Sequence, residues 1–219
     1  GSFVIESSRQ VICYLPGNFH HREHLILKRL VDLLVAVPTV LLILPFAAIV
    51  VKLFQLFQSP GPLFFRQERS GASGESFEIL KFRSMHVRKV TDSPSPDDKT
   101  SRVYAFGAWL RKHSMDELPQ FWNVVKGDLS VVGPRPHLAV HDTQFVAKYP
   151  AYVRRFRVKP GITGLAQVRG HRGAVLTEED IKLRAIADLA YIDRWSVMLD
   201  LIIIAKTALQ VFRPPNSAR

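Results

Sequence analysis

The chain has 219 residues, and its 30 Lys and Arg residues outnumber its 19 Asp and Glu residues, so the formal net charge is +11. Hydrophobic residues make up 47% of the chain and charged residues 22%, which excludes disorder throughout because such a chain buries a core. The single cysteine, Cys13, excludes an intrachain disulfide framework and any cysteine-based zinc site. A basic balance of this size indicates an anionic partner, namely nucleic acid, anionic lipid or a phosphorylated substrate.

An apolar stretch follows an N-terminal extension of residues 1–24. Leu33–Val51 reads LLVAVPTVLLILPFAAIVV and carries no charged side chain. Since a helix rises about 1.5 Å per residue, this stretch just reaches across a hydrocarbon core of roughly 30 Å. The alternative is a buried core helix, but soluble helices rarely run so far without a polar face. We therefore predict a membrane anchor over residues 25–58.

Two features of the anchor bear on its topology. Lys28 and Arg29 precede the apolar stretch and Lys52 follows it, and cations mark the cytoplasmic side of a membrane. Pro38 and Pro45 lie inside the stretch and favour a bend, and either is a candidate for the break. A re-entrant helix-break-helix that returns to the cytoplasmic face satisfies both features. A straight single-span helix with tolerated prolines is the alternative.

Charged residues at the start of the anchor form a second pattern. Asp32 follows Lys28 by four positions and Arg29 by three, so the three side chains share one helix face. A carboxylate at the membrane boundary is costly unless it is paired. We expect an interfacial salt bridge here.

Residues 59–219 are typical of a basic globular domain of the α+β class, mostly helical. We expect short strands at Leu63–Arg69 and Phe77–Phe82, joined by a turn near residues 71–74. We expect helices at Val103–Lys112, at Asp116–Lys126, after the N-cap Thr177 and at Val197–Phe212, the last being interfacial or packed on the core. Residues 91–101 and Lys159–Gly164 are expected to be loops, and Gly133–Pro136 a rigid turn.

The candidate chemistry lies between Arg111 and Pro136, in the sequence RKHSMDELPQFWNVVKGDLSVVGPRP. Asp116 and Glu117 follow Ser114, a candidate N-cap, in the first turn of a predicted helix. The helix dipole keeps carboxylates ionised there, so this pattern alone is also compatible with a purely structural role.

Cations near this segment favour a catalytic role for the two acids. The substrate-binding candidates are Lys81, Arg83, Arg88, Arg111 and Arg135, with Arg135 held between Pro134 and Pro136. Their N–H groups suit phosphate oxygens. A carboxylate among phosphate-binding cations can hold Mg²⁺ or attack phosphorus.

Several motifs occur in a fixed order along the chain. They are KRLVD, the apolar stretch, SPGPLFFRQER, KFRSM, SMDELPQFWNVVKGDLSVVGPRP and KPGITGLAQV. Over Lys28–Phe212 this order resembles the monotopic phosphoglycosyl transferases of bacteria, also called bacterial sugar transferases. The resemblance implies a re-entrant anchor in the bacterial inner membrane and a catalytic domain that faces the cytoplasm. It also implies Mg²⁺-dependent transfer of a sugar phosphate from a UDP-sugar to undecaprenyl phosphate, with release of UMP.

The resemblance also implies roles for individual residues. Asp116 attacks the sugar-linked phosphate to form a covalent aspartyl intermediate, and Glu117 binds Mg²⁺ or assists the lipid acceptor. Arg135 contacts the nucleotide phosphate. The further positions that match the substrate region are Lys81, Arg83 and Arg111. The break in the anchor matches Pro45, although Leu44 replaces the serine that commonly precedes it in the family.

The stretches GPRPHLAVHDTQF and YIDRWSVMLDLIII resemble the subgroup that initiates exopolysaccharides with glucose-1-phosphate, and galactose-1-phosphate is the next expectation. A homo-oligomer is compatible with the sequence. Two other classes are weighed against the transferase. A membrane-tethered nucleic-acid-binding protein would interleave aromatic and basic residues, which this chain does not, so no nucleic-acid partner is expected. A non-catalytic envelope adaptor would not need Asp116 and Glu117.

Overall fold

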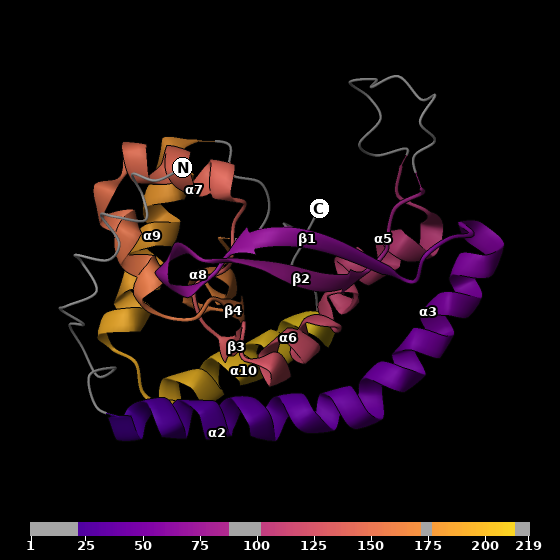
Figure 1. Ribbon diagram of the computed structural model, residues 1–219, viewed down its shortest axis with the longest axis horizontal. Coiled ribbons are helices and arrows are strands. Elements are labelled where there is room, and N and C mark those ends of the chain that lie inside the picture. Colours follow the sequence, from indigo (N-terminus) through magenta and orange to yellow (C-terminus); the bar gives the residue numbers. More distant parts are fainter. Residues whose placement is uncertain (1–21, 88–101, 172–176, 213–219) are drawn as a thin grey trace.

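The computed structural model describes residues 22–87, 102–171 and 177–212. Arg88, the loop expected at residues 91–101 and most of the N-terminal extension lie outside these ranges. The described part is mostly helical, with two small two-stranded sheets, as the α+β expectation requires. A long N-terminal helix runs along one side of the molecule, and the other elements lie on it (Figure 1).

The predicted anchor is a bent helix made of three consecutive segments. They are α2 (Arg22–Pro38), a π-helical turn η2 (Thr39–Ile43) and α3 (Leu44–Gln58). Glu23–Gln58 is long and apolar enough to cross a membrane, and only 11% of its most apolar window is buried. The alternative of a buried core helix is therefore wrong, because most of its apolar side chains face outward.

The bend lies between the two prolines of the apolar stretch. The π-helical turn starts directly after Pro38 and ends two residues before Pro45, and Figure 1 shows α3 leaving the direction of α2 at this point. Within the turn the Leu44 N–H donates to the Thr39 carbonyl, one residue further back than in an α-helix. Pro45 has no N–H to continue the ladder. Both prolines thus border the break.

A β-hairpin follows the anchor. Strands β1 (Phe64–Ser70) and β2 (Ser76–Phe82) pair antiparallel, and the short 3₁₀ turn η3 (Ala72–Gly74) joins them. Both strands lie within one residue of their predicted bounds at each end, so this expectation is confirmed. In the register Lys81 pairs with Phe65, and Phe77 pairs with Arg69.

The helical region around the acid pair differs from the prediction. Helix α5 (Ala105–Lys112) is followed by a 3₁₀ turn, η4 (Met115–Glu117), and then by α6 (Gln120–Lys126). The expectation that Ser114 is an N-cap is wrong, because Ser114 has a positive φ of 55° and its side chain makes no capping hydrogen bond. The acid pair therefore sits on an isolated turn, ahead of Pro119, rather than inside a longer helix.

Two short parallel strands hold the Gly133–Pro136 turn. They are β3 (Ser130–Val132) and β4 (Gly161–Thr163), and the second lies where the sequence predicted a loop. The Gly133 N–H donates to the Thr163 carbonyl at 2.8 Å, and the Gly161 N–H donates to the Pro134 carbonyl at 2.9 Å. A Cβ on Gly161 would lie 2.1 Å from the Gly133 nitrogen, so only glycine at position 161 allows these two backbone segments to approach this closely.

The remaining elements are helical. They are α7 (Ala139–Lys148), the 3₁₀ segment η5 (Pro150–Arg157), α8 (Leu165–Val168), α9 (Glu178–Asp193) and α10 (Val197–Phe212). Thr177 and Asp180 form a capping box at the start of α9, which confirms the predicted N-cap. One face of α9 is apolar and buried, namely Ile181, Ala185, Leu189 and Ile192. The sequence analysis did not predict α7, η5 or α8.

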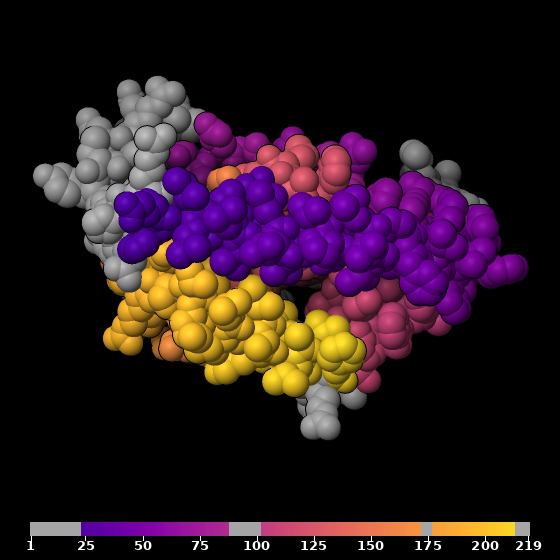
Figure 2. All heavy atoms as spheres, turned by 90° about the horizontal axis from the view of Figure 1, so that it is seen from below, coloured from indigo at the N-terminus to yellow at the C-terminus, as the bar shows by residue number. Residues whose placement is uncertain are grey.

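One face of the molecule is apolar. The bent N-terminal helix and α10 lie side by side on it in Figure 2, and α10 contacts α2. Exposed apolar side chains of these helices include Leu34, Leu42, Phe46 and Phe57 on α2–α3 and Met198, Leu209 and Phe212 on α10. Helix α10 also buries Asp200 and Ile203, so it both packs on the core and presents an apolar face.

Candidate active site

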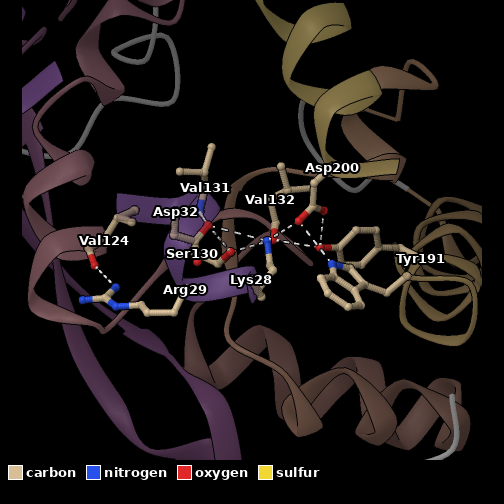
Figure 3. Close-up of polar contacts among 10 residues, drawn as sticks. Lys28, Arg29, Asp32, Val124, Ser130, Val131, Val132, Tyr191 and Asp200 are labelled. Atoms are coloured by element: carbon tan, nitrogen blue, oxygen red, sulfur yellow. Dashed lines mark hydrogen bonds and ion pairs between the residues drawn. The ribbon is translucent and has the colours of Figure 1, made fainter. Parts of the chain in front are cut away.

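The charged residues at the start of the anchor are buried in a joint with the globular part (Figure 3). The Lys28 Nζ lies 2.8 Å from an Asp200 oxygen of α10 and 3.5 Å from an Asp32 oxygen. Asp32 accepts hydrogen bonds from the Ser130 hydroxyl and the Val131 N–H, both at 2.9 Å. The expected interfacial salt bridge is instead an interior one, because the shorter contact of Lys28 joins two helices that are distant in the sequence.

Asp200 is the centre of this joint, which we call the anchor joint and define by Lys28, Asp32 and Asp200. No part of Asp200 is exposed. Besides Lys28, the Tyr191 hydroxyl donates to its carboxylate at 2.8 Å and the Trp195 indole N–H donates at 3.1 Å. Lys28 lies on α2, Tyr191 on α9 and Trp195 between α9 and α10, so the anchor joint ties the anchor, α9 and α10 together.

Arg29 connects the anchor to the helix that follows the acid pair. Its guanidinium donates to the carbonyls of Val124 at 2.6 Å and Val125 at 2.8 Å, in the last turn of α6. The Val124 carbonyl also accepts from the Gly127 N–H at 3.0 Å, and a cation beside these last carbonyls complements the helix dipole. Since α6 begins three residues after Glu117, Arg29 sets the position of the acid pair relative to the apolar face.

The candidate active site is built around Glu117. One of its oxygens accepts from the Lys81 Nζ at 2.6 Å and from the Arg135 guanidinium at 2.7 Å, and the other lies 3.3 Å from Arg135. Lys81 comes from β2 and Arg135 from the rigid turn after β3. Three predicted site residues that are distant in the sequence are thus brought together around one carboxylate.

The two acids have opposite electrostatic environments. Burial on its own raises the pKa of Glu117, but Arg135 and Lys81 outweigh it and lower that pKa far below its ordinary value. For Asp116, burial and then the charge of Glu117 raise the pKa to about 6, against the opposing effects of Lys81 and Arg111. No hydrogen bond or ion pair to the Asp116 carboxylate occurs within the described ranges. Glu117 is therefore committed to its two cations, whereas Asp116 is available to a ligand.

The acid pair fits the way in which Mg²⁺ binds at phosphate sites. Magnesium usually takes one or two carboxylates together with phosphate oxygens, rather than an all-protein cage. Among residues 22–87, 102–171 and 177–212, no group of three or more His, Cys, Asp or Glu side chains forms such a cage. Asp116 offers one such carboxylate, and Glu117, which already accepts from Lys81 and Arg135, is the candidate for a second.

A pocket of about 360 Å³ adjoins the Glu117 cluster. Four cationic side chains line it, Lys81 and Arg135 with Arg69 of β1 and Arg184 of α9, and no lining residue is acidic. His141 and Gln144 of α7 line it as well. Sequence reasoning missed four of these lining residues, namely Arg69, Arg184, His141 and Gln144. The period of two along β1 would have placed Arg69 on the face of Phe65, the partner of Lys81, but no local pattern points to α7 and α9.

A buried polar network lies behind the pocket. The Arg155 guanidinium donates to the Arg135 carbonyl at 2.6 Å and to Asp188 at 2.7 Å, and it also contacts the Tyr152 hydroxyl. Tyr152 donates to Asp142 at 2.5 Å and lies 2.7 Å from the Nδ1 of His137. This network fixes the backbone of the turn that carries Arg135.

His137 lines the pocket in front of that network. Its pKa is lowered to about 4, chiefly by burial, so its imidazole is neutral near pH 7. Its buried Nε2 has no hydrogen-bond partner within the described part of the chain. The pocket wall therefore carries a polar atom that a ligand can satisfy.

The other predicted substrate-binding residues do not join the cluster in the same way. Arg83 is buried, and its guanidinium donates to protein acceptors on Ser59, Pro62 and Met85. The expectation that Arg83 binds substrate is therefore corrected, because its guanidinium holds the loop after α3. Pro134 is buried and shapes the backbone of the turn. Arg111 is exposed on α5, from where its charge lowers the pKa of Asp116.

The chain is similar to known proteins over most of its length. The bacterial sugar transferase family matches residues 23–214. The chain is 42% identical over 218 residues to the UDP-glucose:undecaprenyl-phosphate glucose-1-phosphate transferase of Caulobacter vibrioides, covering 96% of this chain and 79% of that protein. It is 48% identical over 155 residues to the protein of the same name from Xanthomonas campestris pv. campestris, covering 70% of this chain and 32% of that protein.

A third relative has nearly the same length as the matched part. The exopolysaccharide production protein PSS of Rhizobium leguminosarum bv. phaseoli is 36% identical over 193 residues, which covers 84% of this chain and 94% of that protein. The chain therefore belongs to the bacterial sugar transferase family. The prediction that it is a phosphoglycosyl transferase enzyme is confirmed.

Proposed function

We propose that this enzyme transfers glucose-1-phosphate from UDP-glucose to undecaprenyl phosphate, giving undecaprenyl-diphospho-glucose and UMP, as the first membrane step of exopolysaccharide synthesis. The printed activities of the Caulobacter and Xanthomonas relatives and the name of the Rhizobium relative support this proposal. The observation that carries it is the pair of adjacent carboxylates: Glu117 is held by Lys81 and Arg135, whereas Asp116 makes no ion pair with any residue that the structure describes.

The proposed reaction has two displacements at one phosphorus atom. The ionised Asp116 carboxylate attacks the sugar-bearing phosphorus of UDP-glucose, and the bond from that phosphorus to the bridging oxygen breaks, so that UMP leaves. An oxygen of undecaprenyl phosphate then attacks the same phosphorus, and the bond to Asp116 breaks and restores the carboxylate. Two anionic substrates repel each other, and a covalent intermediate lets the nucleotide leave before the lipid reacts.

The neighbouring residues stabilise charge during both displacements. Lys81 and Arg135 would donate hydrogen bonds to the phosphate oxygens, and Glu117 fixes the positions of both cations. When bound at Asp116 and Glu117, Mg²⁺ would neutralise further charge on the phosphate groups. Although the pKa of Asp116 is raised to about 6, it stays below 7, so most of this carboxylate is ionised and nucleophilic at neutral pH.

We further propose that the anchor is re-entrant and that the catalytic part faces the cytoplasm of the bacterial inner membrane. The bend at η2 and the cations at both ends of the apolar stretch support this topology. The apolar face formed by α2, α3 and α10 supports it as well, because a shallowly inserted helix and an interfacial helix would share one plane. Such a position would bring the active site to the phosphate of the lipid acceptor.

Release of UMP tests the reaction. Purified full-length protein in lipid nanodiscs would receive Mg²⁺, undecaprenyl phosphate and one donor at a time: UDP-glucose, UDP-galactose or an N-acetylated UDP-sugar. We expect lipid-dependent UMP from UDP-glucose, and loss of at least about 100-fold in Asp116→Asn because the nucleophile is removed. The matched control is Asp193→Asn, since Asp193 makes a surface ion pair with Arg154. Equal rates in the wild type and Asp116→Asn would rule out Asp116 as the nucleophile.

Mass spectrometry tests the covalent intermediate. Incubation with UDP-glucose without lipid should add one glucose phosphate to the wild-type protein and none to Asp116→Asn. An adduct on another residue would contradict the proposed step.

Cysteine labelling tests the topology. A membrane-impermeant thiol reagent would be applied to sealed inverted vesicles that hold either the native Cys13, before the anchor, or Glu68→Cys in a Cys13→Ser background, after it. Glu68 is exposed on β1, so a cysteine there is accessible to the reagent. Labelling of both sites from the cytoplasmic side supports the re-entrant anchor, whereas labelling from opposite sides would establish a single span.

A further inference from the structure

The outer edge of β2 is bonded to a side chain of α6. One edge of β2 pairs with β1, and α6 lies beside the strand (Figure 1). An unpaired strand edge carries N–H and C=O groups that need partners when they are buried. The Asn123 side chain supplies them, because its Oδ1 accepts from the Leu80 N–H at 3.1 Å and its Nδ2 donates to the Glu78 carbonyl at 2.7 Å. We call this the amide contact and define it by Glu78, Leu80 and Asn123.

In the amide contact, the carboxamide of Asn123 pairs with β2 as the backbone of a neighbouring strand would. Glu78 and Leu80 are two positions apart on the same edge, so one amide with an acceptor and a donor satisfies both. Asn123 is only 2% exposed, and its Nδ2 also donates to an Asp128 oxygen at 3.1 Å. These neighbours require the amide oxygen to face Leu80 and the amide nitrogen to face Glu78.

The amide contact adjoins the candidate active site at both of its ends. On β2, Lys81 directly follows Leu80, and its Nζ lies 2.6 Å from a Glu117 oxygen. On α6, Asn123 lies in the first turn, and the helix begins three residues after Glu117. The strand that carries Lys81 and the turn that carries the acid pair are thus joined at two points, the amide contact and the ion pair.

The ion pair by itself does not set the position of Lys81. A lysine ammonium is a point charge on a flexible four-carbon stem, so its place depends on where the backbone holds that stem. The side chains of Lys81 and Glu117 are 17% and 12% exposed, which leaves the stem little room to adjust if β2 shifts. A displacement of ~1 Å in a group that stabilises charge in the transition state can lower the rate by about 100-fold.

We propose that Asn123 is a positioning residue for the reaction at the acid pair: its side-chain amide holds β2 against α6 and so keeps Lys81 in place beside Glu117. The Asn123 amide bonds to the backbone of β2 rather than to the acid pair, and Asn123 does not line the pocket, so its effect on the reaction passes through Lys81. This inference rests on the proposed function, because Lys81 acts on a phosphate group only if that reaction takes place here.

Pre-steady-state kinetics of the full-length protein in nanodiscs test this role. The release of UMP from saturating UDP-glucose without lipid has an amplitude, which reports the fraction of active enzyme, and a rate constant, which reports the chemical step. Asn123→Asp keeps the shape of the side chain and an acceptor for the Leu80 N–H, but it removes the donor to the Glu78 carbonyl. We expect the rate constant to fall at least about tenfold, while the amplitude stays within about twofold of that of the wild type.

The decisive comparison is made without the Lys81 ammonium. In a Lys81→Met background, Asn123→Asp has no cation left to misplace, so we expect it to lower the rate constant by less than about twofold. The same fold loss in both backgrounds would show that Asn123 acts independently of Lys81 and would overturn the inference. The control is Thr207→Val, which removes an interior hydrogen bond to Thr163 and should leave the rate constant within about twofold of that of the wild type.

A second variant guards against a folding defect. Asn123→Asp brings a second carboxylate next to Asp128, so the exchange of Asn123→Asp with Asp128→Asn restores one amide and one carboxylate at this contact. The donor to the Glu78 carbonyl is still missing, and we expect the same fall in the rate constant. The exchange also removes the exposed ion pair of Asp128 with Lys126, and Lys126→Met controls for that loss.

The possible outcomes separate this inference from the proposed function. A wild-type protein that transfers no sugar phosphate would refute the proposed function. An active wild type whose rate constant is unchanged both in Asn123→Asp and in the exchange would refute the positioning role alone. A loss confined to the amplitude would refute it as well, because Asn123 would then support only the folded state. If the wild type turns over without a burst, the covalent step is refuted, and the comparison with and without Lys81 is made on kcat.

Discussion

The anchor joint makes a quantitative prediction about stability. In Lys28→Met the hydrophobic stem is kept and the ammonium is lost, which leaves the Asp200 carboxylate fully buried with only two neutral donors, Tyr191 and Trp195. Removing one partner of a buried ion pair costs about 3–5 kcal/mol of unfolding free energy, because the remaining charge is uncompensated. For a domain of this size, that loss lowers Tm by roughly 6–20 °C.

The matched control is Lys148→Met. Lys148 makes an ion pair of 2.9 Å with Glu178, but 49% and 75% of the two side chains are exposed. An exposed pair contributes about 0–1 kcal/mol, so we expect Tm to fall by less than about 4 °C. Thermal unfolding of the detergent-solubilised protein, followed by circular dichroism in the same detergent for every variant, measures both shifts.

A double variant tests the physical reason. In Lys28→Met with Asp200→Asn, the buried charge is gone. The asparagine oxygen can accept from the Trp195 indole, while its amide N–H donates to the Tyr191 hydroxyl, which also lies 3.1 Å from the Val132 carbonyl. We expect this variant to recover more than half of the Tm lost in Lys28→Met, as neutral replacement of a buried pair is far less costly than breaking it. A Tm for Lys28→Met within error of that for Lys148→Met would refute the reasoning, and so would a double variant that is less stable than Lys28→Met.

Two further predictions concern catalysis and packing. Because the pKa of Asp116 is raised to about 6 and only its ionised form attacks, the UMP burst in the absence of lipid should fall about tenfold from pH 7.5 to pH 5. A burst rate that is flat over this range would contradict the assignment of Asp116. Gly161→Ala should lower the unfolding free energy by about 1–3 kcal/mol or more, since its Cβ would lie 2.1 Å from the Gly133 nitrogen. Gly74→Ala, with φ of 75° and no atom within 4 Å of its Cβ, controls for backbone strain alone, and an equal loss in the two variants would refute the packing argument.

Much of the local structure could be predicted because its causes are local. The hairpin strands are short runs bounded by turn residues, and α9 begins at a capping box with a periodic apolar face. The apolar stretch of the anchor is visible from hydropathy alone. These features depend on neighbours within a few positions of the sequence, so they can be predicted without knowledge of the fold.

The acid pair shows where local reasoning stops. Asp116 and Glu117 were found from the sequence, but their different states were not. A helix dipole would have kept both ionised, whereas the structure places them on a 3₁₀ turn after a left-handed Ser114. Lys81 and Arg135 form their ion pairs with Glu117, so burial and the charge of Glu117 raise the pKa of Asp116 by more than the neighbouring cations lower it.

The sequence by itself determined the order of the motifs, the membrane-competent length of the anchor and the residue types needed for phosphate chemistry. Tertiary structure alone decided that Arg83 holds a loop and that Arg69 and Arg184 line a common pocket. It also decided that Lys28 pairs more closely with Asp200 than with Asp32, one turn away. The physical reason is that an ion pair or a pocket depends on distances across the fold, between residues far apart in the sequence, and no local periodicity encodes them.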